Sequence, residues 1–427
     1  MPVMTMARRS IIKGMAAAPF VGAAGTVLSP SEAHASTIGS SQFRLRARAS
    51  NSYGRFADLN AGLAARLTKV NARAVLADAD RRAKRLTGAP STARAFQTGF
   101  AWDSADQTVP HWIPQGVTTS ADAYSSGYYG GTDKAVLVSW YFEAHPNGDQ
   151  VVDHPLDKGM RLTFVNHNNA AAPTYRHVLL VEPVRTGTGA PSFRPVRKHA
   201  GGIMWYGDLL YVVDTYKGLR IFDLRTLFKV ATTQKDVCGL HTDGQYHGYG
   251  YRYVLPQSHA YDNAAKYLRY SSIGLDRATN PDSLVISEYS PAGTVSYAED
   301  GFIGTGRPST AVPKIVRWPL DEAGRYLASL TPTEAVSVRQ KKIQGVVSRG
   351  SRHYLAVSDG PSGKGALRTF ASSASTAGTV TSLAVGCEDL SFHSKDATGW
   401  KYGEHVIWNV SEYAKKRYVY AVRADGS

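Results

Sequence analysis

The chain has 427 residues and a formal net charge of +15, with 49 Lys and Arg against 34 Asp and Glu. Charged residues make up only 19% of it, whereas 40 glycines and 24 tyrosines are typical of a β-rich globular protein with many turns. The two cysteines, Cys238 and Cys387, exclude a zinc site built on cysteine but would allow one disulfide in an oxidising compartment.

Residues 1–35 predict an export signal. A basic head precedes an apolar stretch from Gly14 to Leu28, and Ala33-His34-Ala35 is a small-residue cleavage pattern. The run Arg8-Arg9-Ser10-Ile11-Ile12-Lys13 resembles the bacterial twin-arginine signal, with an ordinary secretory signal as the alternative. Either signal implies a secreted, extracellular protein that begins near Ser36 and has no transmembrane segment. Its formal charge would be +13, because removal takes away three basic residues and one acidic residue.

Residues 36–93 are expected to form a leader and a helical arm. The leader, up to about Asn51, is rich in Ser, Ala and Arg and is predicted to be loose. Apolar residues then recur at helical spacing, which predicts one amphipathic helical region over roughly Tyr53–Leu86. The residues that show this spacing are Leu59, Leu63, Leu67 and Val70. We interpret the stripe as a face that packs against the main domain.

From residue 94 to 427 the pattern changes to short strands rich in Val, Tyr, Ile and Trp, separated by Gly, Pro, Asp and Asn. No long helical pattern alternates with them, which argues against a parallel α/β sheet. Several strands recur as a unit of a polar residue, small residues, an apolar run, a turn and a second strand. Repeated four-strand units predict an all-β fold, a β-propeller of five to seven blades. The early strand at 94–100 is predicted to close the ring by pairing with the last strand, 418–422.

The residues that open the units are candidates for a central pocket, because the first strand of each propeller blade lines the channel. These openers are Gln115, His199, His247 or Tyr249, Gln344, and Glu388. A glycoside hydrolase needs a pair of carboxylates, one as acid and one as base or nucleophile. The openers offer only Glu388 with its neighbour Asp389, and adjacent strand residues face opposite sides. This arrangement weakens the hydrolase interpretation.

Histidine, tyrosine and arginine in a basic cleft suit β-elimination of a uronic acid polymer instead. The segment Gly239–Arg252 holds two histidines, three tyrosines and an arginine, and strand alternation would put His247, Tyr249 and Tyr251 on one face. We therefore assign His199 or His247 as base and Tyr249 as acid. The predicted substrate-binding residues are Gln115, Lys198, Tyr251, Arg252, Gln344 and Glu388. Packed aromatic residues and a hydrogen-bonded structural His199 are the alternative interpretation.

The charge also bears on the partner, because a basic surface concentrates polyanions. The densest basic cluster, Arg81-Arg82-Ala83-Lys84-Arg85, lies at a predicted helix end, where cations suit the helix dipole. No nucleic-acid partner is therefore expected. An acidic polysaccharide or cell-wall glycan fits the charge, and so does a solvated surface that only aids solubility.

In repeat style and pocket composition the region after Arg94 resembles secreted bacterial β-propeller proteins, and among them the seven-bladed propeller polysaccharide lyases that cut rhamnose from glucuronate in plant gums. The resemblance implies a secreted monomeric lyase with histidine or tyrosine as catalysts and basic residues on the uronate. The alternatives are a non-catalytic glycan-binding propeller and a propeller glycoside hydrolase. No cofactor is predicted; the EF-hand pattern is absent, and calcium held by loop carbonyls is left open.

Overall fold

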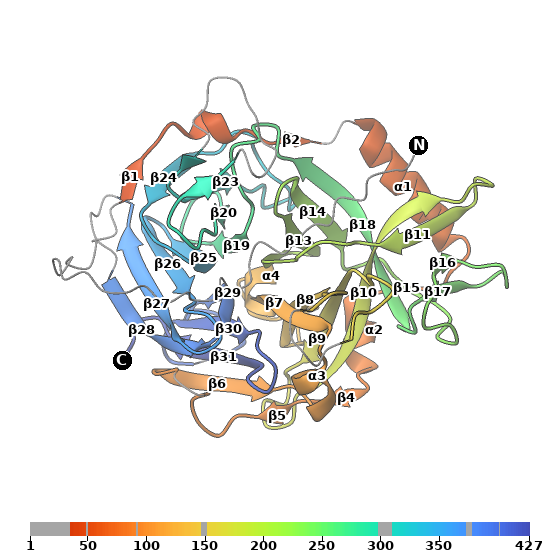
Figure 1. The fold of residues 1–427 in the computed structure, drawn as a ribbon, viewed down its shortest axis with the longest axis horizontal. Coiled ribbons are helices and arrows are strands. Elements are labelled where there is room, and N and C mark those ends of the chain that lie inside the picture. Colours follow the sequence, from red (N-terminus) through yellow and green to blue (C-terminus); the bar gives the residue numbers. More distant parts are fainter. Residues whose placement is uncertain are drawn as a thin grey trace, which may run out of the picture.

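The computed structural model describes residues 35–47, 50–90, 93–146, 152–297, 310–372, 378–400 and 402–427. Within these ranges the chain is an all-β propeller, viewed along its axis in Figure 1, so the predicted fold class is confirmed. The predicted export signal lies outside the described residues, except for Ala35.

Five blades of antiparallel strands can be traced in the described ranges, and the first two share one large sheet. Blade I consists of β7 (Trp112–Thr119), β8 (Ala135–Phe142), β9 (Met160–Asn166) and β10 (Thr174–Arg185). Blade II consists of β12 (Ile203–Tyr206), β13 (Leu209–Asp214), β14 (Gly218–Asp223) and β18 (Tyr253–Asp262). Their outer strands, β10 and β18, pair in parallel, which joins the two blades at the rim.

The other three blades each form a sheet of their own. Blade III consists of β19 (Ser272–Asp276), β20 (Ser283–Ser287), β23 (Lys314–Pro319) and β24 (Glu334–Val338). Blade IV consists of β25 (Ile343–Arg349), β26 (Arg352–Val357), β27 (Lys364–Ala371) and β28 (Gly378–Val385). Blade V consists of β29 (Cys387–His393), β30 (Val406–Ser411), β31 (Tyr418–Arg423) and β6 (Phe96–Ala101).

The third blade begins later than the repeats predict. The expected unit at 246–254 is not a blade: β17 (Tyr246–Gly248) forms a hairpin with β16 (Cys238–Leu240), and Val254 belongs to the outer strand β18. Between β17 and β18 the chain turns, because Tyr249 and Gly250 have φ angles of 52° and 84°. This left-handed backbone interrupts the strand that the alternation of residues predicts.

The ring closes as predicted, because β6 from the N-terminal part pairs with the last strand, β31. Phe100 lies opposite Val419, and Gly99 lies opposite Tyr420. The two strands approach so closely that a Cβ at Gly99 would lie 2.7 Å from the Tyr420 Cβ. Pairing the two ends of the chain within blade V removes the open edge that the sheet would otherwise present.

The core lies between the blades, where five clusters of buried apolar side chains fill the five interfaces. Trp140 and Trp408 lie in the cluster between blades I and V. Trp205 lies in the cluster between blades I and II, and Trp318 lies in the one between blades II and III. All four indoles are fully buried. Burial of one large apolar side chain contributes about 1.5–3 kcal/mol, so the apolar faces of the strands hold the ring together.

The N-terminal arm forms a belt of short strands around the outer rim. Its strand β1 (Ala35–Thr37) pairs with blade III, β2 (Arg46–Ala47) with blade II, β4 (Arg81–Arg82) with blade I and β5 (Lys84–Arg85) with blade V. The expectation of a loose leader is wrong for its described part. Phe43 in the short helix η1 (Ser40–Phe43) is buried and stacks on Tyr267, with 5.7 Å between ring centroids.

The predicted helical region is interrupted. Helix α1 (Ser50–Ala64) is followed by strand β3 (Lys69–Val70), which pairs with β15 (Leu227–Lys229), and by the short helix α2 (Ala72–Ala77). The pairing with β15 stops the helix before the apolar stripe ends. None of the helices in the described residues is long and apolar enough to cross a membrane.

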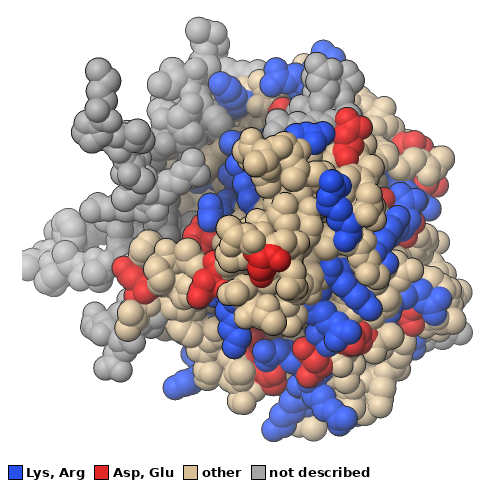
Figure 2. All heavy atoms as spheres, turned by 90° about the vertical axis from the view of Figure 1, so that its right-hand side faces the viewer, with Lys and Arg blue, Asp and Glu red and all other residues tan. Residues whose placement is uncertain are grey.

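The remaining elements are short. They are α3 (Ser104–Thr108), α4 (Ser120–Ala123), β11 (Pro191–Pro195), β21 (Val295–Ser296) and β22 (Thr310–Ala311). The disulfide that the cysteine count allows is not formed, because Cys238 lies in the β16–β17 hairpin and Cys387 in β29. Figure 2 shows Lys and Arg spread over the face that carries α1 and this hairpin, with Asp and Glu among them. The positive charge on this face is therefore dispersed.

Candidate active site

A narrow pocket of about 50 Å³ opens at one end of the propeller channel. The innermost strands β7, β12, β19, β25 and β29 contact one another there, near the centre of Figure 1. The pocket is lined by residues of all five blades: Gln115, His199, Gly201, Thr215, Tyr216, Arg269, Ser271, Tyr289, Gln344 and Glu388. Four of the predicted openers, Gln115, His199, Gln344 and Glu388, are thus brought together.

Irregular strand pairing aims three of these side chains at the pocket. The register shifts in β7 around Gln115, in β25 around Gln344 and in β29 around Glu388. Such bulges re-aim a side chain and end regular pairing, and they are frequent next to active sites. The strands are also close to one another, since a Cβ at Gly345 would lie 2.8 Å from the Glu388 carbonyl oxygen.

Glu388 is a carboxyl group with no positive partner. Its residue is 2% exposed, and Gln344 Nε2 donates a hydrogen bond to its Oε1 at 3.2 Å. No Lys or Arg of the described chain forms an ion pair with it. Burial, and then the negative charges of Glu412 and Asp389, raise the pKa of Glu388 well above its ordinary value. Glu388 therefore holds a proton more readily than an ordinary glutamate.

Glu412 is the second carboxylate of this site. It follows the last residue of β30 and is half-buried, and Gln115 Nε2 donates to its Oε2 at 3.3 Å. Burial and then the charge of Glu412 raise the pKa of Tyr141 well above its ordinary value. The Tyr141 ring stacks on His199 with 4.1 Å between centroids. Glu412 therefore lies close enough to Glu388 to affect its pKa, and the two carboxyl groups differ in exposure.

Asp389 does not form the carboxylate pair, although it neighbours Glu388 in sequence. Its buried Oδ2 accepts hydrogen bonds from the backbone N–H groups of Ile203 at 3.0 Å and Val117 at 3.3 Å. These bonds tie β29 to β12 and β7. Asp389 therefore holds the inner strands together, on the strand face opposite Glu388, as the strand alternation predicts.

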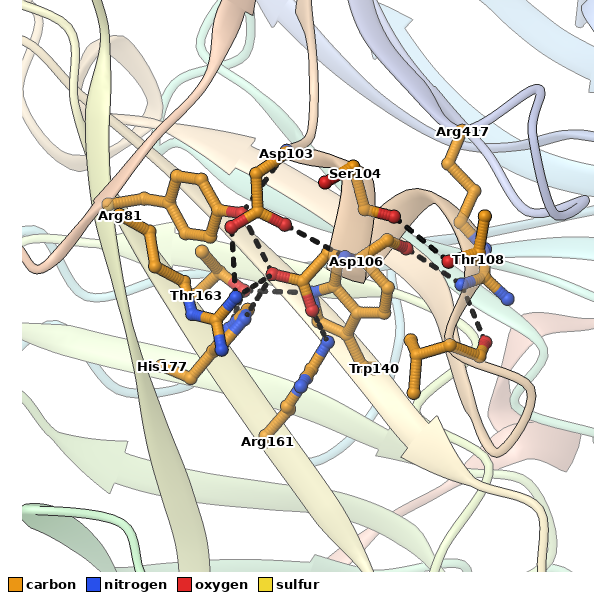
Figure 3. Close-up of polar contacts among 12 residues, drawn as sticks. Arg81, Asp103, Ser104, Asp106, Thr108, Trp140, Arg161, Thr163, His177 and Arg417 are labelled. Carbon is orange, nitrogen blue, oxygen red and sulfur yellow. Dashed lines mark hydrogen bonds and ion pairs between the residues drawn. The ribbon is translucent and has the colours of Figure 1, made fainter.

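Arg417 links Glu412 to a buried ion cluster behind blade I. Its Nε donates to the Glu412 carbonyl oxygen at 2.9 Å, and its Nη1 donates to the carbonyl oxygens of Asp106 and Val109 at 2.8 and 2.9 Å. Burial lowers the pKa of Arg417 to about 10. Figure 3 shows Arg417 beside α3, which carries Asp106. The backbone position of Glu412 is thus fixed through α3.

The Asp106 cluster consists of Arg81, Asp106, Arg161, Tyr175 and His177 and is drawn in Figure 3. The Asp106 carboxylate lies 2.8 Å from Arg161 Nη2, 2.9 Å from His177 Nε2 and 3.3 Å from Arg81 Nη1. Burial opposes ionisation, but Arg161, His177 and Arg81 together lower the pKa of Asp106 well below its ordinary value. Burial lowers the pKa of His177 to about 4, so this histidine is neutral at pH 7.

The other predicted site residues do not line the pocket. Lys198 Nζ lies 3.4 Å from Asp214, and Arg252 Nε lies 3.3 Å from Asp78. Tyr251 packs against Trp112, with 6.2 Å between ring centroids. His247 and Tyr249 lie in and just after β17, at the periphery of the ring in Figure 1. The structure thus separates this group from Gln115, His199, Gln344 and Glu388.

Six of the lining residues were not predicted from sequence, and neither were Tyr141 and Glu412 beside them; the six are Gly201, Thr215, Tyr216, Arg269, Ser271 and Tyr289. A usable signal existed for Glu412. Cys387 lies opposite Ser411 in the β29–β30 pair, so the start of one strand and the end of the next meet at the same edge. A hairpin prediction for 387–410 would therefore have placed residue 412 next to the Glu388 opener.

Comparison with known proteins gave matches among solved structures alone. No protein-family model and no curated protein matches the chain. A GH43_1 enzyme from Xanthomonas citri gives a TM-score of 0.37 at 11% identity, covering 76% of this chain and 93% of its own. CoXyl43, a GH43 β-xylosidase/α-arabinofuranosidase from a compost microbial metagenome, gives 0.34 at 9% identity, covering 75% and 94%. The RS223 β-xylosidase gives 0.34 at 9% identity, covering 74% and 93%.

The expectation of a polysaccharide lyase is wrong. The three solved structures named above are glycoside hydrolases, and none of the three is a lyase. The expected base His247 and acid Tyr249 lie outside the pocket, whereas Glu388 lines it and Glu412 is bound to the lining residue Gln115. The sequence reasoning missed this pair because Glu412 was not recognised as a neighbour of Glu388.

Proposed function

We propose that this protein is a glycoside hydrolase that cleaves a terminal sugar from a glycan in the central pocket. The observation that carries the proposal is the pairing of Glu388 with Glu412. One carboxyl group is buried with a raised pKa, and the other is half-buried beside an amide donor. Two carboxyl groups in such different environments divide the roles of acid and base, which is what glycoside hydrolysis requires.

In the proposed reaction protonated Glu388 donates its proton to the glycosidic oxygen. The bond between that oxygen and the anomeric carbon breaks, and its electron pair stays with the leaving oxygen. The Glu412 side chain stabilises the positive charge that develops on the sugar. It then either adds to the anomeric carbon and is displaced by water, or takes a proton from the attacking water. Glu388 ends as a carboxylate and is reprotonated for the next cycle.

The rest of the pocket suits a sugar. His199 and Tyr289 supply ring faces, and the amides of Gln115 and Gln344 already hydrogen-bond the two carboxyl groups. Tyrosine rings offer an apolar body with a polar tip, which matches a sugar. The pocket measures about 50 Å³, which is less than a sugar ring needs, so we propose that lining side chains move aside when a terminal sugar enters. The predicted export signal would deliver the enzyme to glycans outside the cell.

The test first identifies the glycans that the protein binds and then measures whether it cleaves them. A glycan array, including xylosides and arabinofuranosides, is probed with the Glu388→Gln variant, and every bound glycan is then incubated with the wild-type protein. Chromatography should show release of a terminal sugar, and Glu388→Gln and Glu412→Gln should each lower the rate at least ~100-fold. The Asp359→Asn variant, which alters an exposed pair with Lys342, serves as the control and should keep its activity.

Two results would overturn the proposal. Glycans that are bound but remain intact would indicate a non-catalytic glycan-binding propeller. Full activity in both glutamine variants would remove the carboxyl pair from the reaction.

A further inference from the structure

The β16–β17 hairpin, far from the central pocket at the rim of Figure 1, carries a second cluster of chemically active side chains. His241 and Asp243 lie in its tip, and His247 lies in β17. Potential ligand atoms of all three lie within 4.8 Å of one another. Two imidazoles and one carboxylate make a donor set that binds divalent transition metals, zinc in particular.

The distances within the cluster are close to those of a metal site. His247 Nε2 lies 2.9 Å from Asp243 Oδ2, and His241 Nδ1 lies 3.7 Å from Asp243 Oδ1. Ligands on a tetrahedral zinc ion, each about 2.0–2.1 Å from the metal, lie roughly 3.3 Å apart. The His241 side chain is 36% exposed, so a small rotation of its ring can bring the donors together.

The backbone of the hairpin tip holds the three side chains on one side. The His241 N–H donates to the Gln245 carbonyl oxygen at 2.9 Å, and the Gly244 N–H donates back to the His241 carbonyl oxygen at 3.0 Å. The Gln245 N–H also donates to Asp243 Oδ1 at 2.8 Å, which orients that carboxylate. The positions are therefore set before any ligand binds, which lowers the entropic cost of binding.

Two ring nitrogens of the cluster, His241 Nδ1 and His247 Nδ1, are buried without a hydrogen-bond partner. His241 Nδ1 is shut off from solvent and has no hydrogen-bond partner, although it faces the Asp243 carboxylate. A buried polar atom without a partner costs about 1–3 kcal/mol, and coordination of a metal would remove that cost. His247 is fully buried, so its imidazole is fixed in place beside this nitrogen.

We propose that His241, Asp243 and His247 bind one divalent transition-metal ion, with zinc as the metal that the donors favour. The ion would fasten the tip of the hairpin to β17, and the hairpin in turn is anchored on β11, where the Leu240 N–H donates to Ser192 Oγ at 2.9 Å. With three protein ligands, the fourth position on the ion would be taken by water, and the site is separate from the propeller channel. A hydrogen bond between His247 and Asp243 alone would leave His241 without a function.

The experiment uses the protein without a polyhistidine tag, dialysed against a chelator and titrated with zinc chloride by calorimetry. We expect one equivalent of zinc to bind and the melting temperature to rise with zinc concentration, because the ion binds the folded state. Cobalt, added in place of zinc, should give the visible absorption of a four-coordinate site. His241→Ala and Asp243→Asn should weaken binding by more than the 10–100-fold that loss of an outer-shell partner costs.

The matched control is His145→Ala. His145 Nδ1 lies 2.9 Å from Asp153, so this variant removes another His–Asp pair, one that is exposed. It should leave the zinc affinity unchanged. Absence of saturable binding at one equivalent would overturn the proposal. An equal loss of affinity in the His145→Ala variant would also overturn it, because the binding would then be non-specific.

Discussion

Asp106 and Glu388 are both buried carboxyl groups, but their surroundings have opposite effects. Asp106 is surrounded by Arg161, Arg81 and His177, and its pKa is lowered. Glu388 has an amide donor and a second carboxylate for neighbours, and its pKa is raised. The charge of Asp106 is balanced by its neighbours, and its contacts hold α3 against the strands of blade I. Glu388 lies in a pocket that Arg269 also lines, but it forms no ion pair among the described residues and its pKa is raised, as in an acid catalyst.

The largest effect on stability is expected from a substitution of Asp106. Asp106→Asn leaves the buried Arg161 without a carboxylate, whereas Arg81 keeps its pair with Asp103, so we expect a loss of about 3–5 kcal/mol in the free energy of unfolding at pH 7. Urea denaturation measures it. Because the pKa of Asp106 is lowered below its ordinary value of 3.8, its contribution is present above that pH and is lost as the pH falls further. The difference between wild type and variant should therefore shrink in acid.

A surface ion pair provides the control for this effect. Asp359→Asn breaks the exposed pair with Lys342 and should cost less than about 1 kcal/mol. Equal losses in the two variants would mean that the Asp106 cluster contributes no more than a surface pair.

Glu388→Gln should have the opposite effect and raise the free energy of unfolding. The pKa of Glu388 is raised in the folded protein, so its stabilising contribution is present below the unfolded value near 4.5 and is lost as the pH rises through the folded value. Glutamine imitates the protonated form and removes this loss. Above pH 5 the variant should become progressively more stable than the wild type, by about 1.4 kcal/mol for each unit of pKa shift. Unfolding curves that run parallel from pH 4 to 9 would contradict this prediction.

The smallest effect is expected at Gln344. Gln344→Ala removes the amide that donates to Glu388 Oε1 and should lower the free energy of unfolding by about 0.5–1.5 kcal/mol. The melting temperature and kcat/KM are measured together. A loss of kcat/KM as large as that of Glu388→Gln would show that Gln344 takes part in the reaction itself rather than orienting Glu388.

Much of the fold could be predicted because it depends on local patterns. Strand alternation and turn residues revealed the units of blades I, II, IV and V, and the sequence also indicated closure by the strand at 94–100. The third blade was misplaced because the tyrosine-rich run at 246–254 alternates like a strand. The break in that run rests on a left-handed Tyr249, a conformation that residue type does not indicate.

The candidate site was predicted in part for the same reason. Gln115, His199, Gln344 and Glu388 open strands or the segments before them, and position in a blade suffices to place them. Glu412 lies beyond the end of its strand, so its place depends on how two strands pair. The Arg417 contacts that fix it join segments about 310 residues apart in the chain, which no local pattern reveals.

The belt formed by the N-terminal arm has a consequence for the order of events during synthesis. Its short strands pair with blades III, II, I and V, all of which lie later in the chain. Strands of two or three residues are not stable alone, so they can form only after their partner strands have formed. The strand β6 that follows pairs with β31, which is far later in the chain. The arm and β6 are therefore synthesised early but are among the last segments to reach their native neighbours.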